Sequence, residues 1–465
     1  MDLDKNKSPG PIRRLKNYPS LPFPRNEAKD LFQAAPPPPY YSLVFHITSI
    51  RHFVTMMATR MSASSSSGKK TSSKARSSSS SSNVRRLRAT TSAPTTPASS
   101  AAPPASARGG VPEGTPVVEP RDLPSRPRRN RKSRHLRRAF SETTVRPEHF
   151  ILPVFVHDGE EDIPINAMPG VSRLGWQNGL VREVEAAMKE GVHQVVIFPK
   201  TPDELKTSTA EEAFNPDGLA QRSISLLKEK FGNDIVVYTD VALDPYNSDG
   251  HDGIVSDAGV ILNDETIHYL QKQAVSQARA GADCVSPSDM MDGRVAAIRE
   301  ALDAEGFTDV SIMSYTAKYA SAFYGPFREA LASAPKAGEA HRIIPPNKKT
   351  YQQDPANYRE ALREAMLDEE EGADIMMVKP GMPYLDIIRL LRDNTTLPVA
   401  AYHVSGEYSM LKAAAAAGYL NEQDAVLESL LSMRRAGSDL ILTYYATQAA
   451  RWIQEGGLDA SQGGD

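Results

Sequence analysis

The sequence predicts a (β/α)₈ TIM barrel over residues 149–458, preceded by an extended N-terminal arm and a disordered targeting region. Short β-branched runs alternate with amphipathic stretches, which is the pattern of βαβ units and a parallel sheet. Eight such units over about 300 residues match the size of this barrel. A doubly wound open sheet is the alternative, but no GxGxxG motif follows the first strand.

The predicted strands read as continuous apolar runs, as expected of strands that are buried on both faces. In chain order they are residues 149–156, 193–199, 234–243, 283–288, 310–317, 374–379, 398–405 and 439–446. The helical stretches between them include residues 179–191, 263–282, 293–307, 357–373 and 409–418. Several of these stretches end in glycine, the usual residue after a helix C-terminus.

The N-terminal part of the 465-residue chain is basic and the remainder is acidic. Residues 1–140 contain 26 Lys+Arg against 7 Asp+Glu, and the rest contains 28 against 50. Residues 1–114 are rich in Ser, Ala and Pro and bury too little apolar surface to fold. Their acid-poor composition favours an organelle transit peptide over a plain disordered tail. The stretch before Met56 is either a first targeting step or an over-extended gene model.

The densest charge run, residues 126–138, allows a nucleic-acid-binding arm as one interpretation. The run lacks interleaved aromatics, and no nucleic-acid motif follows it. We therefore expect residues 115–148 to form an arm that contacts another subunit, and residues 459–465 to form a short tail. The apolar run at residues 40–50 is too short to span a membrane. One cysteine, Cys284, excludes an internal disulfide and a multi-cysteine metal site.

A barrel of this kind places its active site at the C-terminal ends of the strands. The polar residues at those ends are Lys200, Asp240, Asp244, Asp289, Lys318, Lys379, Ser405 and Tyr444.

Lys318 and Lys379 end two neighbouring predicted strands, which lie about 5 Å apart in a sheet. Burial and a neighbouring like charge both lower the pKa of a lysine. A shift from about 10.4 to about 7 corresponds to about 4–5 kcal/mol of bias against the ammonium form. A neutral amine can attack a ketone and form a Schiff base. The alternative is that one lysine pairs with a buried carboxylate while the other extends to water.

Several motifs resemble, in order, those of the porphobilinogen synthase (5-aminolevulinate dehydratase) family. They are SPSDMMDGR, SYTAKYASAFYGPFREA, YQQDPANYREALREA, MMVKPGMPYLDIIR and VSGEYSM, and the resemblance spans residues 115–458. It implies a lyase that condenses two 5-aminolevulinate molecules to porphobilinogen, with loss of water, for heme and chlorophyll biosynthesis. Lys379 would hold the first substrate and Lys318 the second.

The resemblance also implies which residues bind the substrate carboxylates, for which cations and hydroxyls are suited. Ser405 and Tyr444 would bind the carboxylate of the first substrate. Arg328, Lys348 and Gln352 would bind that of the second. Two departures stand out: residues 330–349 are longer than the usual family stretch, and His403 replaces a glutamine.

The aspartate-rich residues 240–259 suit a lid over the barrel mouth. Part of the family binds zinc through cysteines here, whereas this chain has Ala242, Asp244 and Asp252. Oxygen ligands favour Mg²⁺, so the resemblance implies the magnesium-dependent plastid type with no catalytic Zn²⁺.

The same resemblance places the acidic groups of the site. The carboxylates of Asp244, Asp252 and Asp289 would face the amino group of the second substrate, directly or through Mg²⁺ bound by Asp244 and Asp252. Glu364 matches the ligand of an allosteric Mg²⁺.

The family likeness further implies a homo-octamer that can exchange with a hexamer, located in the chloroplast stroma. A class I aldolase remains an alternative, but it needs only one Schiff-base lysine and usually a phosphate site. A non-enzymatic alternative makes the basic arm the functional part and predicts salt-sensitive nucleic-acid affinity.

Overall fold

The computed structural model describes residues 112–116, 118, 121–337 and 343–457. The chain divides into two compact units, Met1–Val117 and Val118–Asp465. The second unit contains all the secondary structure reported below. The expected targeting region lies outside the described residues, except for 112–114.

Eight parallel strands form a closed barrel in the second unit. They are β1 (Phe150–His157), β4 (Gln194–Pro199), β5 (Val236–Val241), β8 (Cys284–Pro287), β9 (Ser311–Lys318), β10 (Ile375–Lys379), β11 (Val399–His403) and β12 (Leu440–Thr443). Each is hydrogen-bonded to the next, and β12 pairs with β1 to close the ring. All eight predicted strands are therefore confirmed, and the open-sheet alternative is wrong.

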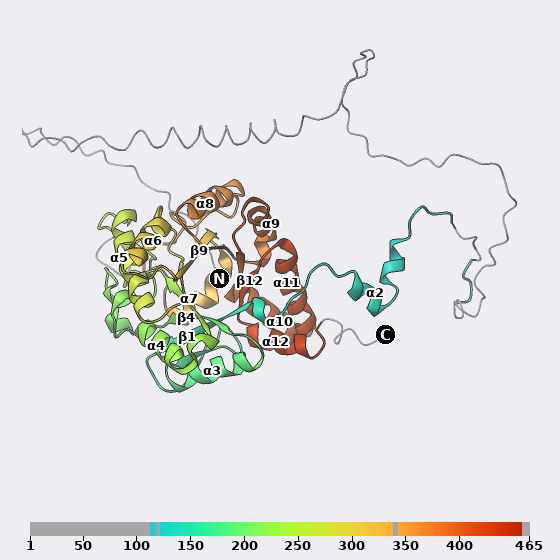
Figure 1. Ribbon diagram of the computed structural model, residues 1–465, viewed down its shortest axis with the longest axis horizontal. Coiled ribbons are helices and arrows are strands. Elements are labelled where there is room, and N and C mark those ends of the chain that lie inside the picture. Colours follow the sequence, from blue (N-terminus) through green and yellow to red (C-terminus); the bar gives the residue numbers. More distant parts are fainter. Residues whose placement is uncertain (1–111, 117, 119–120, 338–342, 458–465) are drawn as a thin grey trace, which may run out of the picture. The chain divides into compact units, whose positions relative to one another are not determined.

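The helices surround the strands (Figure 1). They are α3 (Asn178–Lys189), α4 (Leu219–Phe231), α5 (Asn263–Arg279), α6 (Arg294–Ala304), α7 (Gly325–Leu331), α8 (Arg359–Glu370), α9 (Leu385–Asn394), α10 (Ser405–Ala416), α11 (Glu422–Ala436) and α12 (Ala446–Gln454). Helix α3 illustrates why they pack there. It buries Leu180, Val184 and Ala187, whose spacing places them on one face. A fully buried Leu or Val side chain contributes about 1.5–3 kcal/mol.

Short elements complete the described chain. Strands β2 (Ile163–Pro164) and β3 (Ser172–Gly175) extend the sheet beside β1, and β6 (Ile254–Val255) pairs with β7 (Ile261–Leu262) at the end of the aspartate-rich segment. The 3₁₀ turns are η2 (Pro127–Arg131), η3 (Pro147–His149), η4 (Asp203–Leu205), η5 (Glu211–Phe214), η6 (Gly232–Asp234), η7 (Ala322–Tyr324) and η8 (Met382–Tyr384).

Aromatic side chains fill the barrel interior below the strand ends. The ring centroids of Phe155 and Phe198 are 5.9 Å apart, and those of Tyr315 and Tyr402 are 6.3 Å apart. These rings are fully or almost fully buried. The interior is therefore a packed core rather than a pore, and reactive groups are confined to its open end.

The predicted arm contains η2 and α2 (Arg134–Ala139). Within the described part of the chain, neither helix has a buried residue. No helix in the described ranges is both long enough and apolar enough to cross a membrane.

Candidate active site

Lys318 and Lys379 are the last residues of β9 and β10, and the strand register pairs them directly. Both are almost completely buried, at 5% and 7% exposure. The ring of Tyr315 lies beneath both, 6.0 Å from the Lys318 Nζ and 5.0 Å from the Lys379 Nζ. The two amines therefore point inward over the same ring at one end of the barrel. A pair of surface lysines, or one that extends to water, is excluded.

Four aromatic rings surround the amine of Lys379. Its Nζ lies 4.6 Å from the ring centroid of Tyr402 and between 5.0 and 5.1 Å from those of Tyr315, Tyr324 and Phe327. Burial and then the neighbouring Lys318 lower the pKa of Lys379 to about 7, although nearby aspartates oppose this shift. A substantial fraction of this side chain is consequently a neutral, nucleophilic amine near neutral pH.

Lys318 has a different environment, because its amine faces oxygen atoms. Its Nζ lies 3.2 Å from Oδ1 of Asp252 and donates a hydrogen bond to the backbone carbonyl of Ser288. We expected an uncharged amine at both positions. Because Lys318 forms an ion pair with Asp252, the expectation of an uncharged amine describes Lys379 better than Lys318. The sequence alternative in which one lysine pairs with a buried carboxylate describes Lys318, but no local pattern identifies Asp252, 66 residues earlier in the chain, as the partner.

Lys348 lies between the two lid carboxylates. Its Nζ is 3.1 Å from Asp244 Oδ2 and 2.8 Å from Asp252 Oδ2. Lys348 therefore reaches the site although residues 330–349 are longer than the usual family stretch. Burial alone would raise the pKa of Asp252, but the ammonium groups of Lys318 and Lys348 hold that pKa well below its usual range. The hydroxyl of Tyr351 also donates to Asp252, at 2.9 Å.

A small cavity lies between these groups at the strand ends. Its lining residues are Asp240, Asp244, Asp252, Ser288, Lys318, Tyr324, Phe327, Arg328, Ser333, Lys348, Gln352 and Lys379. The cavity volume is about 30 Å³, which admits about one or two water molecules. The contacts of Asp252 with Lys318 and Lys348 would have to separate for a larger molecule to enter this cavity.

Ser405 and Tyr444 border this cavity region without lining the cavity itself. The Ser405 Oγ accepts the backbone N–H of Phe327 at 3.0 Å, and the Tyr444 hydroxyl lies 3.0 Å from that of Tyr402. Both residues are thus next to side chains that contact Lys379. Their hydroxyls are engaged within the protein, so a carboxylate would have to replace these partners.

Two further carboxylates lie under the lid. Burial raises the pKa of Asp289 to about 6, while Arg294 opposes the shift. Asp289 Oδ1 accepts the N–H of Met291 at 2.7 Å, and Oδ2 is buried without a hydrogen-bond partner among the described residues. Burial and then Asp244 raise the pKa of Asp240 to about 6. The sequence places Asp240 at a strand end but assigns it no role. In the structure Asp240 lies beside both lysines, where its carboxylate influences the pKa of Lys379.

Replacing Asp240 with asparagine is expected to shift the acidic limb of the pH–activity profile to lower pH. The Asp240 carboxylate raises the pKa of Lys379. Its removal lowers that pKa further, and the amine is then neutral at lower pH. The pH dependence of kcat/KM measures this shift in the free enzyme. Asp303→Asn on the surface of α6 should leave the limb unchanged. An upward shift in Asp240→Asn would contradict the account.

Glu364 lies away from the lysines, in a separate cavity of about 500 Å³. That cavity is also lined by Asn263, Asp292 and Glu360. Burial raises the pKa of Glu364, Arg294 opposes this shift, and the nearby Asp368, Asp292 and Glu360 add to it. A hydrated cation would relieve this concentration of negative charge.

The two expected magnesium positions differ in how well they fit a cation. In the described ranges, no three His, Cys, Asp or Glu side chains converge as a metal site. Asp244 and Asp252 already pair with ammonium groups, so their arrangement does not suit a cation held directly by both. The Glu364 cavity has room for an ion that keeps most of its waters, as Mg²⁺ usually does.

His403, the departure noted in the sequence, is fully buried at the end of β11. Its Nδ1 lies 3.0 Å from Oγ1 of Thr443, and its ring stacks on Tyr445. Burial lowers its pKa to about 4. It is a neutral packing residue and lines none of the cavities described here.

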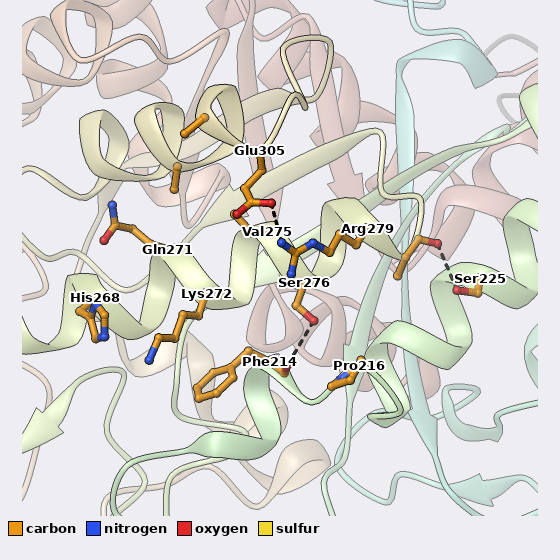
Figure 2. A pocket seen from close by; sticks show the side chains of 13 residues that line it. Phe214, Pro216, Ser225, His268, Gln271, Lys272, Val275, Ser276, Arg279 and Glu305 are labelled. Atoms are coloured by element: carbon orange, nitrogen blue, oxygen red, sulfur yellow. Dashed lines mark hydrogen bonds and ion pairs between the residues drawn. The ribbon is translucent and has the colours of Figure 1, made fainter.

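A larger cavity of about 620 Å³ lies outside the barrel, against α4, α5 and α6. Figure 2 shows Arg279 directed to Glu305 and Ser276 to the backbone of Phe214. None of the predicted site residues lines it. Volume alone therefore does not identify the reactive site, whereas the convergence of buried charged groups does.

Comparisons with known proteins match this geometry. The family profile of delta-aminolevulinic acid dehydratase matches residues 124–452. The chloroplastic delta-aminolevulinic acid dehydratase of Chlamydomonas reinhardtii is 70% identical over 347 residues, covering 74% of this chain and 89% of that protein. The chloroplastic delta-aminolevulinic acid dehydratase 1 of Arabidopsis thaliana is 64% identical over 340 residues, covering 73% of this chain and 77% of that protein.

A solved structure agrees with the sequence relatives. It is the delta-aminolevulinic acid dehydratase (porphobilinogen synthase) of Toxoplasma gondii in complex with the reaction product porphobilinogen. The TM-score is 0.69 at 56% sequence identity, with coverage of 72% of this chain and 92% of that one.

Proposed function

This chain belongs to the delta-aminolevulinic acid dehydratase, or porphobilinogen synthase, family, and from that premise we propose how its strand-end residues carry out the reaction. The chain is a lyase of tetrapyrrole biosynthesis that makes porphobilinogen, and it is a plastid enzyme like its chloroplastic relatives. The observation that carries the mechanism is the pair of buried lysines in direct register at the ends of β9 and β10.

Lys379 is the residue that holds the first 5-aminolevulinate. Its neutral amine attacks the ketone carbon, and the ketone oxygen leaves as water when the imine forms. The surrounding rings exclude water that would hydrolyse the imine. Ser405 and Tyr444 donate hydroxyl groups to the carboxylate of this substrate.

Lys318 holds the second 5-aminolevulinate by the same chemistry. Its ammonium group parts from Asp252 and gives its proton to a neighbouring base such as Asp240, which leaves the free amine. That step requires movement of the lid. Arg328, Lys348 and Gln352 then bind the second carboxylate, for which a guanidinium group and an ammonium group are well suited. Joining the two substrates releases both lysines, so they are regenerated for the next turnover.

The aspartates supply negative charge and proton transfer around the second substrate. Asp244, Asp252 and Asp289 face its amino group. Asp240 and Asp289, whose pKa values are each raised to about 6, can accept and return protons near neutral pH. A class I aldolase would use one lysine, so the register of two buried lysines favours the dehydratase.

The family is metal-dependent, and we propose Mg²⁺ rather than Zn²⁺ as its metal in this chain. The lid has Ala242, Asp244 and Asp252 and provides no thiolates. The only cysteine, Cys284, lies on β8, where burial raises the pKa of its thiol. Glu364, together with waters, would hold an allosteric Mg²⁺ that supports the active assembly.

Removal of zinc alone is expected to leave porphobilinogen formation unchanged, whereas removal of all divalent ions should lower it several-fold. Readdition of Mg²⁺ should restore activity in the wild type but not in Glu364→Gln. Mg²⁺ binding measured by calorimetry should be lost in the same variant. Loss of activity after zinc-selective chelation, or full activity without divalent ions, would contradict the proposal.

We also propose that the chain forms a homo-oligomer, an octamer that exchanges with a hexamer. The arm supports this proposal, because no residue of α2 or η2 is fully buried within the described part of the chain. The acidic residues of α8 would suit the basic residues of the arm of another copy. Neither a nucleic-acid partner nor a membrane span is part of the proposal.

A further inference from the structure

A buried carboxylate joins the two strand-end loops that carry Lys379 and Ser405. Glu407, the third residue of α10, is fully buried. Its Oε2 accepts the backbone N–H of Val404 at 2.6 Å, within the same turn. Its Oε1 accepts the N–H of Met382 at 2.7 Å, and its Oε2 that of Gly381 at 3.4 Å. One side chain therefore ties the turn after β11 to the loop after β10.

Helix capping accounts for only one of these three hydrogen bonds. A glutamate at the third helical position commonly accepts the N–H of the residue before the helix, which here is Val404. The bonds to Gly381 and Met382 cross to another loop, 26 and 25 residues away respectively. Burying a carboxylate costs free energy unless it is well hydrogen-bonded. A cap alone does not require that burial, so the contact between the loops needs its own explanation.

The loop that Glu407 holds is the one that follows the catalytic lysine. The carbonyl of Lys379 accepts the N–H of Tyr319 at 3.0 Å and the hydroxyl of Tyr324 at 3.2 Å. Pro380 has no N–H, so the next backbone donors are Gly381 and Met382. Both of these donate to Glu407. The backbone of Lys379 is thus fixed from the β9 side by the tyrosines and from the β11 side by Glu407.

The turn from which Glu407 projects is the one that begins with Ser405. Ser405 lies two residues before Glu407, and its Oγ accepts the N–H of Phe327 at 3.0 Å. The hydrogen bonds of Glu407 therefore hold the loop after Lys379 and the turn that begins at Ser405 in a fixed relative position. This in turn sets the distance between the Lys379 amine and the Ser405 hydroxyl.

We propose that Glu407 is a positioning residue that sets this spacing and so selects the chain length of the keto acid bound at Lys379. The inference rests on the proposed function, which places the substrate ketone on Lys379 and its carboxylate on Ser405. In 5-aminolevulinate two methylene groups separate these functional groups. A displacement of about 1 Å at a reacting centre costs about 100-fold in rate, so a firmly held spacing discriminates against a ligand that is one methylene longer.

Reductive trapping with keto acids that lack the amino group measures this selectivity at one site. The probes are 4-oxopentanoate, which has two methylenes between its ketone and carboxylate, and 5-oxohexanoate, which has three. Each forms an imine with the lysine and releases water. Borohydride then adds hydride to the imine carbon and, with a proton on nitrogen, leaves a stable secondary amine that peptide mapping locates.

Wild-type protein should trap 4-oxopentanoate on Lys379 in strong preference to 5-oxohexanoate. Glu407→Gln, which is nearly isosteric, should reduce this preference at least about five-fold. Glu407→Asp keeps the carboxyl group but shortens its reach, and it should also reduce the preference. This second variant serves as the test if Glu407→Gln does not fold. Asn421→Ala is the control, because Asn421 caps α11 by accepting the N–H of Asp424 at 3.0 Å. It should lower the unfolding midpoint without changing the preference.

A preference within about two-fold of wild type in a folded Glu407 variant would overturn the inference and leave Glu407 as a structural residue. Failure of the wild type to trap 4-oxopentanoate on Lys379 would instead overturn the proposed function, and the inference with it. The two failures are therefore distinguishable in one experiment.

Discussion

Replacing Lys379 with alanine is expected to reduce porphobilinogen formation by at least about 10⁴-fold, since it removes the nucleophile that binds the first substrate. No other amine replaces it. Lys318 and Lys348 also line the cavity, but both are held by lid carboxylates. Turnover of 5-aminolevulinate, followed by porphobilinogen formation, measures the effect.

The fold should survive this change. The amine of Lys379 is surrounded by rings, and burial of its charged form is unfavourable. Lys379→Met, which preserves the volume of the side chain, should be equally inactive and at least as stable as wild type. The unfolding midpoint and circular dichroism report on the fold. Turnover above about 1% of wild type in a folded Lys379→Met variant would contradict the assigned role.

Replacing Lys318 with methionine is also expected to reduce turnover by about 10³-fold or more, because the second substrate loses its covalent attachment. Imine formation between the first substrate and Lys379 should remain. Lys318 lowers the pKa of Lys379, so its removal raises that pKa and moves imine formation at Lys379 to higher pH. Rates of borohydride trapping at a series of pH values would reveal this shift.

The Lys318 variant also has a structural consequence to control for. Asp252 loses one of its two ammonium partners and keeps only Lys348. Tyr351→Phe removes a different partner of Asp252 while leaving both amines in place. It should retain far more activity than Lys318→Met. If the two variants lost activity equally, Lys318 would act only by holding the lid.

Local sequence patterns were sufficient to predict the barrel. Apolar runs such as IMMV before Lys379 are buried on both faces, and the described strand β10 ends at that lysine. The rule that parallel strands present their C-terminal ends together then brought Lys318 and Lys379 to one cavity. The predicted end of a strand differs from the observed end by a residue or two in other cases, such as β11, which ends at His403. Ser405, predicted as the last strand residue, begins α10.

The contacts that tune these residues were not predictable in the same way. Asp252 reaches Lys318 across 66 residues of sequence, and Glu407 reaches Met382 across 25. Such contacts depend on how irregular loops pack, for which no local periodicity exists. The two lysines therefore differ in a way that the local sequence patterns did not indicate: among the described residues Lys318 forms an ion pair with Asp252, whereas the amine of Lys379 lies among aromatic rings. The aromatic rings around Lys379 read in the sequence as ordinary core residues.

The central claim is that two lysines share one substrate cavity and that each binds one keto acid. Borohydride trapping with 5-aminolevulinate, followed by peptide mapping, tests it most directly. We predict label on Lys379 when substrate is limiting, and additional label on Lys318 when substrate is saturating. Label on Lys318 first, on Lys348, or on neither strand-end lysine would contradict the account.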